Sequence, residues 1–91
     1  MSQDYRIIEL SAQECWDILD RERFGRLAVA VNGDPDIFPI NYVTADRAIY
    51  LRSAEGSKLV SVVINEWVAF ETDGYVPEDN HAWSVVVRGH A

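Results

Sequence analysis

The sequence predicts one small, mainly β domain whose sheet rolls into a barrel, with short helices beside it. Five short runs rich in apolar and β-branched residues are separated by turn residues. Several of these runs are apolar on both faces, and a flat sheet in so small a chain would leave one face without cover. A length of 91 residues and a hydrophobic content of 48% suffice for one core, so we expect a single domain over residues 1–91.

The first element is a helix that begins at Ala12. Ser11 and Glu14 form a capping box, in which each side chain binds the backbone N–H of the other residue. The helix should fade in the polar stretch 20–23, and Gly25 should break the pattern before the first strand. Its apolar face should consist of residues at helical spacing, namely Cys15, Ile18 and Leu19.

A hairpin follows the helix. Residues 27–31 form a continuous apolar run, typical of a strand buried on both faces, and residues 32–35 are a strong turn signal. The second arm, residues 37–43, contains Pro39. Because proline cannot donate to a ladder, this point should lie at a sheet edge, a bulge or a strand break.

Three further strands are expected at residues 48–53, 67–72 and 83–88. Asp46 supports a turn before the first of them, and residues 57–64 have the spacing of a short helix. Residues 73–80 read as a polar loop. The last strand is apolar on both faces, so we expect a partner subunit to cover one of them.

The composition excludes several classes of function. With 8 basic and 15 acidic residues the net charge is −7, which argues against non-specific nucleic-acid binding and against docking on anionic membranes. No apolar run approaches the roughly 20 residues of a membrane-spanning helix, and residues 1–4 lack the features of a secretory signal. We therefore expect a cytoplasmic protein. Cys15 is the only cysteine, so no internal disulfide is expected.

Catalytic and metal-binding motifs are not found in the sequence. Cys15, His81 and His90 lack the spacing of a nucleophilic triad or of a zinc site, and Cys15 reads as a core residue. Glu71 and Asp73 share one strand face and read as ordinary exposed residues. No catalytic residue and no metal ligand is therefore predicted.

One basic cluster is a candidate binding site. Residues 52–58 contain two cations, two hydroxyls and a glycine at the start of the expected short helix. Such groups can bind an anion through charge, hydrogen bonds and the helix dipole. The phosphate-loop pattern itself is incomplete, because no glycine precedes Gly56 at the required distance. The alternative is that Arg52 and Lys58 are solvated residues beside a turn.

Five segments in a fixed order carry a family resemblance. They are Phe24-Gly25-Arg26-Leu27-Ala28, Phe38-Pro39-Ile40-Asn41-Tyr42, Tyr50-Leu51-Arg52-Ser53 with Gly56-Ser57-Lys58-Leu59, Val68-Ala69-Phe70-Glu71, and Trp83-Ser84-Val85-Val86-Val87-Arg88-Gly89. From about Leu10 onward the chain resembles the pyridoxamine 5′-phosphate oxidase-like family of FMN-binding split β-barrels, in particular its short members related to nitroimidazole-resistance proteins.

The resemblance implies a homodimer that holds one FMN in each of two clefts between its subunits. The implied cofactor-binding residues are Pro39, Ile40, Asn41, Tyr42, Arg52, Ser53, Lys58, Leu59, Trp83 and Ser84. The segment 39–42 would contact the flavin ring, with Asn41 as a hydrogen-bonding partner and Tyr42 as a wall. The basic cluster would bind the phosphate. Trp83 would line the cleft, or else belong to the barrel core.

The expected function is therefore that of an FMN-binding, flavin-dependent oxidoreductase acting on a small molecule. The flavin carries the redox chemistry, which explains why no catalytic residue is found. Two alternatives remain: a non-catalytic flavin-, deazaflavin- or haem-binding protein, and a cofactor-free dimeric interaction module. Members of the family usually continue past the motif at 88–91, so we expect the barrel to lack its C-terminal strand or to be completed by the partner.

Overall fold

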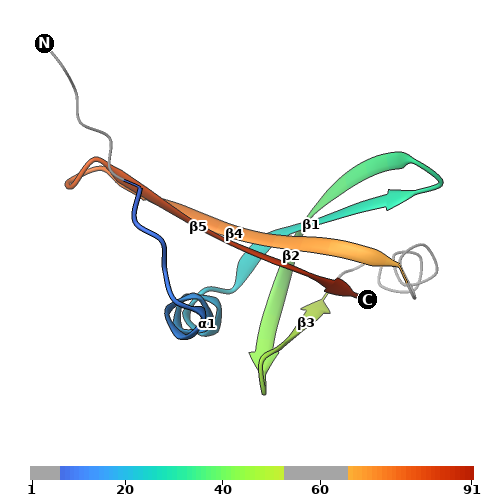
Figure 1. Ribbon diagram of the computed structural model, residues 1–91, viewed down its shortest axis with the longest axis horizontal. Coiled ribbons are helices and arrows are strands. Elements are labelled where there is room, and N and C mark those ends of the chain that lie inside the picture. Colours follow the sequence, from blue (N-terminus) through green and yellow to red (C-terminus); the bar gives the residue numbers. More distant parts are fainter. Residues whose placement is uncertain (1–6, 53–65) are drawn as a thin grey trace, which may run out of the picture.

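The computed structural model describes residues 7–52 and 66–91. This part of the chain contains one helix and five strands: α1 (Ala12–Arg21), β1 (Phe24–Val31), β2 (Asp34–Ala45), β3 (Ala48–Arg52), β4 (Trp67–Val76) and β5 (His81–His90) (Figure 1). The strands form one antiparallel sheet in the order β3-β2-β1-β4-β5. The predicted mainly β architecture is confirmed, while the predicted helix at 57–64 lies outside the described residues.

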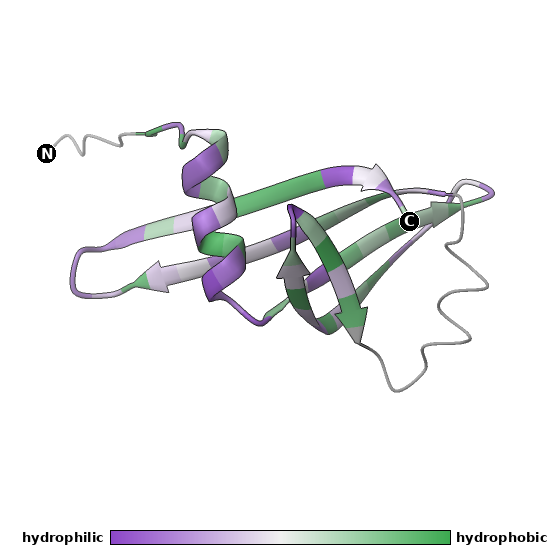
Figure 2. Cartoon of the chain, turned by 90° about the horizontal axis from the view of Figure 1, so that it is seen from below, coloured by the Kyte–Doolittle hydropathy of each residue, from purple (hydrophilic) through white to green (hydrophobic). Residues whose placement is uncertain are grey.

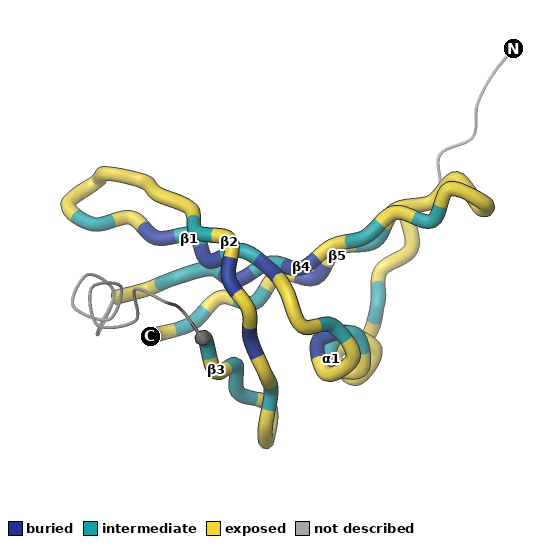
Figure 3. The backbone as a smooth tube through the Cα atoms, turned by 180° about the vertical axis from the view of Figure 1, so that it is seen from behind, coloured by how far each residue is buried: buried dark blue, intermediate teal, exposed yellow. Residues whose placement is uncertain are grey.

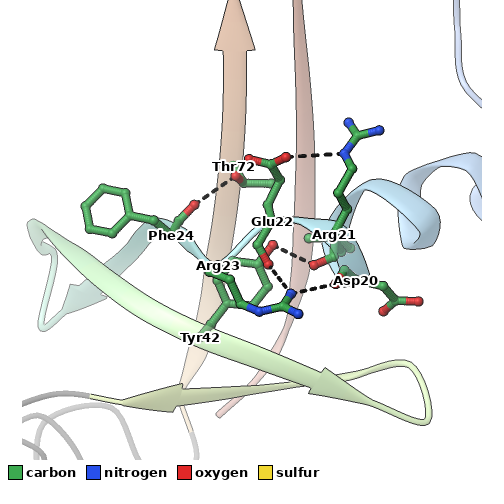
Figure 4. Close-up of polar contacts among 8 residues, drawn as sticks. Asp20, Arg21, Glu22, Arg23, Phe24, Tyr42 and Thr72 are labelled. Carbon is green, nitrogen blue, oxygen red and sulfur yellow. Dashed lines mark hydrogen bonds and ion pairs between the residues drawn. The ribbon is translucent and has the colours of Figure 1, made fainter.

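Helix α1 begins as the capping box predicts. The Ser11 hydroxyl accepts a hydrogen bond from the Glu14 N–H at 3.1 Å, and the Ser11 N–H donates to the Glu14 carboxylate at 2.9 Å. These hydrogen bonds to the charged form lower the pKa of Glu14. At the other end of the helix, the Arg23 guanidinium donates to the carbonyl oxygens of Asp20 and Glu22, at 2.6 and 2.9 Å (Figure 4). These bonds fix the turn that leads into β1.

Strand β1 begins earlier than predicted. Gly25 lies inside the strand and does not interrupt it. A Cβ atom at this position would overlap the carbonyl oxygen of Glu71 and come within 2.5 Å of the Phe70 ring. Gly25 is therefore required because β4 passes close to its backbone, which propensity alone cannot reveal.

The β1–β2 hairpin turns at Asn32 and Gly33, within the predicted turn 32–35, and β2 already begins at Asp34. Both residues have positive φ, 54° and 78°, which is the conformation of a two-residue type I′ turn. The prediction that β1 is buried on both faces was wrong, because burial alternates along the strand, with Leu27 and Val29 buried. The turn predicted at Asp46 is also present, before β3.

The two prolines of β2 lie where they cost no ladder hydrogen bond to β1. Tyr42 donates its N–H to the Arg23 carbonyl at 3.0 Å, and antiparallel alternation then directs the nitrogens of Pro35 and Pro39 away from β1. Strand β3 pairs with β2 only over residues 41–45, so Pro39 lies at an edge in the described part of the sheet. Of the three positions predicted for Pro39, namely an edge, a bulge or a strand break, the described residues show the edge.

Strands β4 and β5 form the longest hairpin, and the polar loop predicted at 73–80 is wrong for its first four residues. The ladder continues from Trp67 opposite His90 to Val76 opposite His81. Gly74 makes this continuation compatible with the bulky Trp83, because a Cβ atom there would lie 2.6 Å from the indole ring. The sheet can therefore extend through a segment whose composition is typical of loops.

The sheet has a core face and an outer face. Helix α1 lies against the core face, where it contacts β2 and β5 (Figure 2). The buried residues lie on α1 and on β1, β2, β4 and β5 (Figure 3). The buried hydrophobic residues are Leu19, Leu27, Val29, Ile40, Tyr42, Phe70 and Val85. The side chains that alternate with these along each strand form the outer face. No helix of the described part of the chain covers the outer face.

The edge strands β3 and β5 line a common cavity of about 320 Å³, which makes the sheet a partly closed barrel. Ile49 and Leu51 of β3 and Val87 of β5 are among its lining residues. The cavity is mainly apolar, and Trp16 of α1 also lines it. The single described helix, α1, is too short to cross a membrane.

Candidate functional site

The four residues of β2 predicted to contact a cofactor lie on opposite faces of the sheet. Pro39 and Asn41 are exposed on the outer face, whereas Ile40 and Tyr42 are buried in the core, at 4% and 1% exposure. This split follows from the two-residue period of a strand. A ligand on the outer face of this chain would therefore contact only Pro39 and Asn41 of the four.

Tyr42 has a structural role in the described part of the chain. Its hydroxyl donates to the Leu19 carbonyl at 2.7 Å, in the last turn of α1. Its ring packs edge-on against Phe70, with 4.7 Å between the ring centroids. Burial raises the pKa of the Tyr42 phenol, so the phenol stays protonated and remains a donor. The assignment of Tyr42 to a cofactor stays a prediction from the resemblance.

The predicted phosphate-binding cluster is described only at its first residue. Arg52 ends β3 and is the cross-strand partner of Asn41 on β2. Ser53, Lys58 and Leu59 lie outside the described residues. The register thus brings together two residues that the sequence predicted separately, one for the flavin ring and one for its phosphate.

Trp83 and Ser84 lie on opposite faces of β5. Trp83 is half-buried on the core face, where it covers Gly74 and lies 5.9 Å from the guanidinium carbon of Arg21. Ser84 is exposed on the outer face, opposite Asp73. Of the two readings given for Trp83, its position favours the packing role.

The outer face carries all the large exposed hydrophobic side chains of the described strands. Cross-strand partners share a face, and one such row runs from Pro39 through Arg26 and Glu71 to Val86. The large hydrophobic residues of this face are Phe24, Ile37, Val43, Tyr50, Trp67, Tyr75 and Val86, each at least 44% exposed. Each of the five strands thus contributes at least one exposed apolar side chain to this face.

An ion cluster lies in the middle of the outer face. The Arg26 guanidinium is 3.0 Å from a Glu71 carboxylate oxygen and 3.5 Å from an Asp73 carboxylate oxygen. Hydrogen bonding with Asp73 raises the pKa of Glu71, burial raises it further, and Arg26 opposes both effects. Both carboxylates thus contact the same guanidinium.

This cluster was not predicted. The sequence placed Glu71 and Asp73 on one strand face, which is confirmed, and classed them as ordinary exposed residues. Arg26 is 45 residues away from Glu71 in the chain, and only the pairing of β1 with β4 brings it there. The two-residue spacing of Glu71 and Asp73 was the available signal for a cluster, but it does not identify the cation that binds them. Among the described residues there is no cluster of His, Cys, Asp or Glu that could hold a metal ion.

Comparison with known proteins identifies the family. The model of the family described as pyridoxamine 5′-phosphate oxidase matches residues 11–91. The chain belongs to this family. Its membership confirms the split-barrel fold that the resemblance implied. No curated protein matches the chain.

Three solved structures are similar to this member of the family. An FAD-binding protein from Mycobacterium smegmatis is 48% identical, with a TM-score of 0.78. A putative pyridoxamine 5′-phosphate oxidase from Corynebacterium glutamicum is 44% identical, with a TM-score of 0.75. An FAD-binding protein from Mesorhizobium loti is 31% identical, with a TM-score of 0.72. Each match covers 89% of this chain. The chain spans 73%, 62% and 59% of those proteins, respectively.

Proposed function

We propose that this chain binds a flavin nucleotide, FMN, in a cytoplasmic homodimer and acts as a flavin-dependent oxidoreductase on a small molecule. The family supports flavin binding, since two relatives that are 48% and 31% identical are FAD-binding proteins. The single observation that carries the proposal is the outer face, where exposed apolar side chains surround polar groups on neighbouring strands.

The groups of the outer face fit the chemistry of a flavin. The isoalloxazine ring is flat, apolar at one end and rich in hydrogen-bond acceptors at the other. Phe24 and Val86 offer apolar surface, and the Asn41 amide and the Arg26 guanidinium are donors for ring oxygens and nitrogens. Arg52, next to Asn41 in the register, supplies the positive charge that a phosphate requires in a chain of net charge −7.

The protein's own contribution is binding and orientation. A bound flavin supplies the redox chemistry, which leaves the chain to hold and tune it. Asn41 and Arg26 would donate hydrogen bonds, and the apolar side chains around them would exclude water.

Cofactor titration tests this proposal. The purified protein should show flavin absorbance in the visible region, or should quench flavin fluorescence on addition of FMN. Titrating FMN and FAD side by side decides which nucleotide is preferred. A folded dimer that binds neither nucleotide at micromolar concentrations would contradict the proposal.

The variant Lys58→Ala tests the phosphate site. We expect it to weaken FMN binding more than riboflavin binding, because only FMN carries the phosphate. The affinities of the two ligands are measured by fluorescence titration. Arg47→Ala is the matched control, since Arg47 is an exposed cation in the β2–β3 turn and its loss should leave the ratio of affinities unchanged. Equal losses for both ligands in Lys58→Ala would exclude this assignment.

A flavin-binding protein without turnover is the second candidate, favoured because two relatives are FAD-binding proteins. Adding NADH or NADPH to the flavin-loaded protein separates the two candidates. Bleaching of the flavin absorbance, followed by its return in air, supports an oxidoreductase. A stable spectrum with both nucleotides favours the binding protein.

A further inference from the structure

We propose that the cavity between β3 and β5 is a second ligand site, which binds a small apolar carboxylate, and that Arg47 at its opening binds the carboxylate group. The core residues Leu27 and Phe70 line this cavity, so it lies on the core face of the sheet. The proposed flavin site lies on the outer face. The two sites are therefore separate, and the inference goes beyond the proposed function.

The cavity has the size of a small ligand. Its volume is about 320 Å³, which lies at the lower end of the range of about 300 to 1,000 Å³ that is typical of ligand pockets. A group the size of a water molecule occupies about 30 Å³ in a liquid, so the cavity has room for about ten such groups. A compact molecule of about ten non-hydrogen atoms therefore fits it.

The lining offers apolar surface that the fold leaves incompletely covered. Four apolar side chains from three strands line the cavity and pack against the core without being fully buried, namely Ile49, Leu51, Val68 and Val87. An apolar ligand in the cavity would remove their remaining exposed surface from water, which is favourable. Trp16 of α1 adds an aromatic wall.

Gly89 helps to keep the cavity open at β5. It lines the cavity and lies directly opposite Val68 in the β4–β5 ladder. A Cβ atom added at Gly89 would meet no atom beyond its chain neighbours within 4 Å. A larger residue at this position would therefore project into open space and reduce the volume that a ligand can occupy.

Arg47 is held beside the cavity by α1. It lines the cavity from the β2–β3 turn, and its guanidinium donates to the Gln13 side-chain oxygen at 2.8 Å. The Gln13 amide in turn donates to the Asp17 carboxylate at 2.9 Å, which fixes the direction of the amide. In the described part of the chain, no carboxylate lies within 4.0 Å of Arg47. The guanidinium is thus positioned at the cavity without an acidic partner among these residues.

A carboxylate is the group that complements this guanidinium. A guanidinium presents five N–H donors in a planar fork, and a carboxylate can accept two of them side by side. Gln13 accepts one donor of Arg47, so others are left for a ligand. The other titratable residue of the lining is His90, whose ring packs against Trp67 with 3.9 Å between centroids. In a chain of net charge −7, Arg47 therefore provides local attraction for an anion.

Calorimetric titration of the full chain with octanoate, a carboxylate of about ten non-hydrogen atoms, tests the inference. At an ordinary affinity per atom, we expect a Kd of about 1 mM or lower. Octylamine and 1-octanol carry the same chain with a positive and a neutral head group. Octanoate should bind at least about tenfold more tightly than either, because only octanoate can form a charge-assisted pair with Arg47. Octanol that binds as tightly as octanoate, or octanoate that does not bind at millimolar concentrations, would overturn the inference.

Two variants locate the ligand. Gly89→Leu fills the cavity and should weaken octanoate binding by at least about tenfold, while FMN binding stays as in the wild type. Arg47→Gln should lower the affinity for octanoate to that for octanol. Arg21→Gln is its matched control, because it removes the same charge from an exposed residue of α1 that does not line the cavity, and it should keep the preference for octanoate.

Circular dichroism establishes that each variant is folded, and Arg47→Gln still tests the site if Gly89→Leu does not fold. Octanoate binding that is unchanged in Arg47→Gln overturns the inference. A chain that binds FMN but not octanoate contradicts the inference alone. A chain that binds octanoate with the expected response to these variants but binds no flavin supports the inference and contradicts the proposed function.

Discussion

Tyr42 shows, at the scale of single residues, how one position can satisfy a family motif and still serve the fold. Its hydroxyl pairs with the Leu19 carbonyl, one of the last carbonyl groups of α1, which have no partner within a helix. Its ring fills the space beside Phe70. The neighbouring Asn41, by contrast, is exposed and free to meet a ligand on the outer face. One strand thus supplies a core anchor and a binding residue from adjacent positions.

The variant Tyr42→Phe tests the structural role of the hydroxyl. We expect the free energy of unfolding to fall by about 1 to 2 kcal/mol, since the buried Leu19 carbonyl loses its donor while the ring packing is kept. Urea denaturation followed by circular dichroism measures the change. Tyr50→Phe, at an exposed position of β3, is the control and should alter stability by less than about 0.5 kcal/mol. A flavin affinity that fell while stability stayed unchanged would instead assign Tyr42 to the cofactor.

Secondary-structure elements were predictable where the signal is local. The capping box of α1 and the turns at 32–33 and 46–47 depend on residues next to one another, and each was found where the sequence placed it. Gly25 was interpreted as a breaker and Gly74 as part of a polar loop, and both lie inside strands. Their role depends on contacts with residues distant in the chain or across a hairpin, so no local pattern could reveal it.

The variant Gly25→Ala tests the close approach of β1 and β4. The added methyl group would overlap a carbonyl oxygen of β4, which cannot move without breaking the ladder. We expect a loss of about 1 to 3 kcal/mol or more in the free energy of unfolding, measured by urea denaturation. Gly89→Ala is the control, because no other atom lies within 4 Å of the added carbon. Equal stabilities for both variants would show that the strands can separate to admit a side chain.

At the scale of the whole molecule, the sequence identified the kinds of residue in the candidate site but not their arrangement. An acidic chain must bind an anion through a local basic cluster, and this argument selected residues 52–58. Asn41 and Arg52 are neighbours only because of the register in which β2 pairs with β3. A shift of one residue would move either side chain to the other face. The ion cluster depends in the same way on the pairing of β1 with β4.

The variant Val86→Asp tests the outer face as the surface on which two copies meet. Val86 is 54% exposed and lies opposite Glu71, so a third carboxylate there would add like charge beside the ion cluster and remove an apolar anchor. We expect the dimer Kd at pH 7.5 to rise by at least about tenfold, a change that corresponds to 1.4 kcal/mol. Sedimentation equilibrium measures it, and circular dichroism confirms that the fold is kept. Ile8→Asp is the matched control, because Ile8 is 75% exposed and precedes α1, outside the sheet. A dimer that tolerates Val86→Asp but is disrupted by Ile8→Asp would move the pairing surface away from the sheet and toward the N-terminal segment.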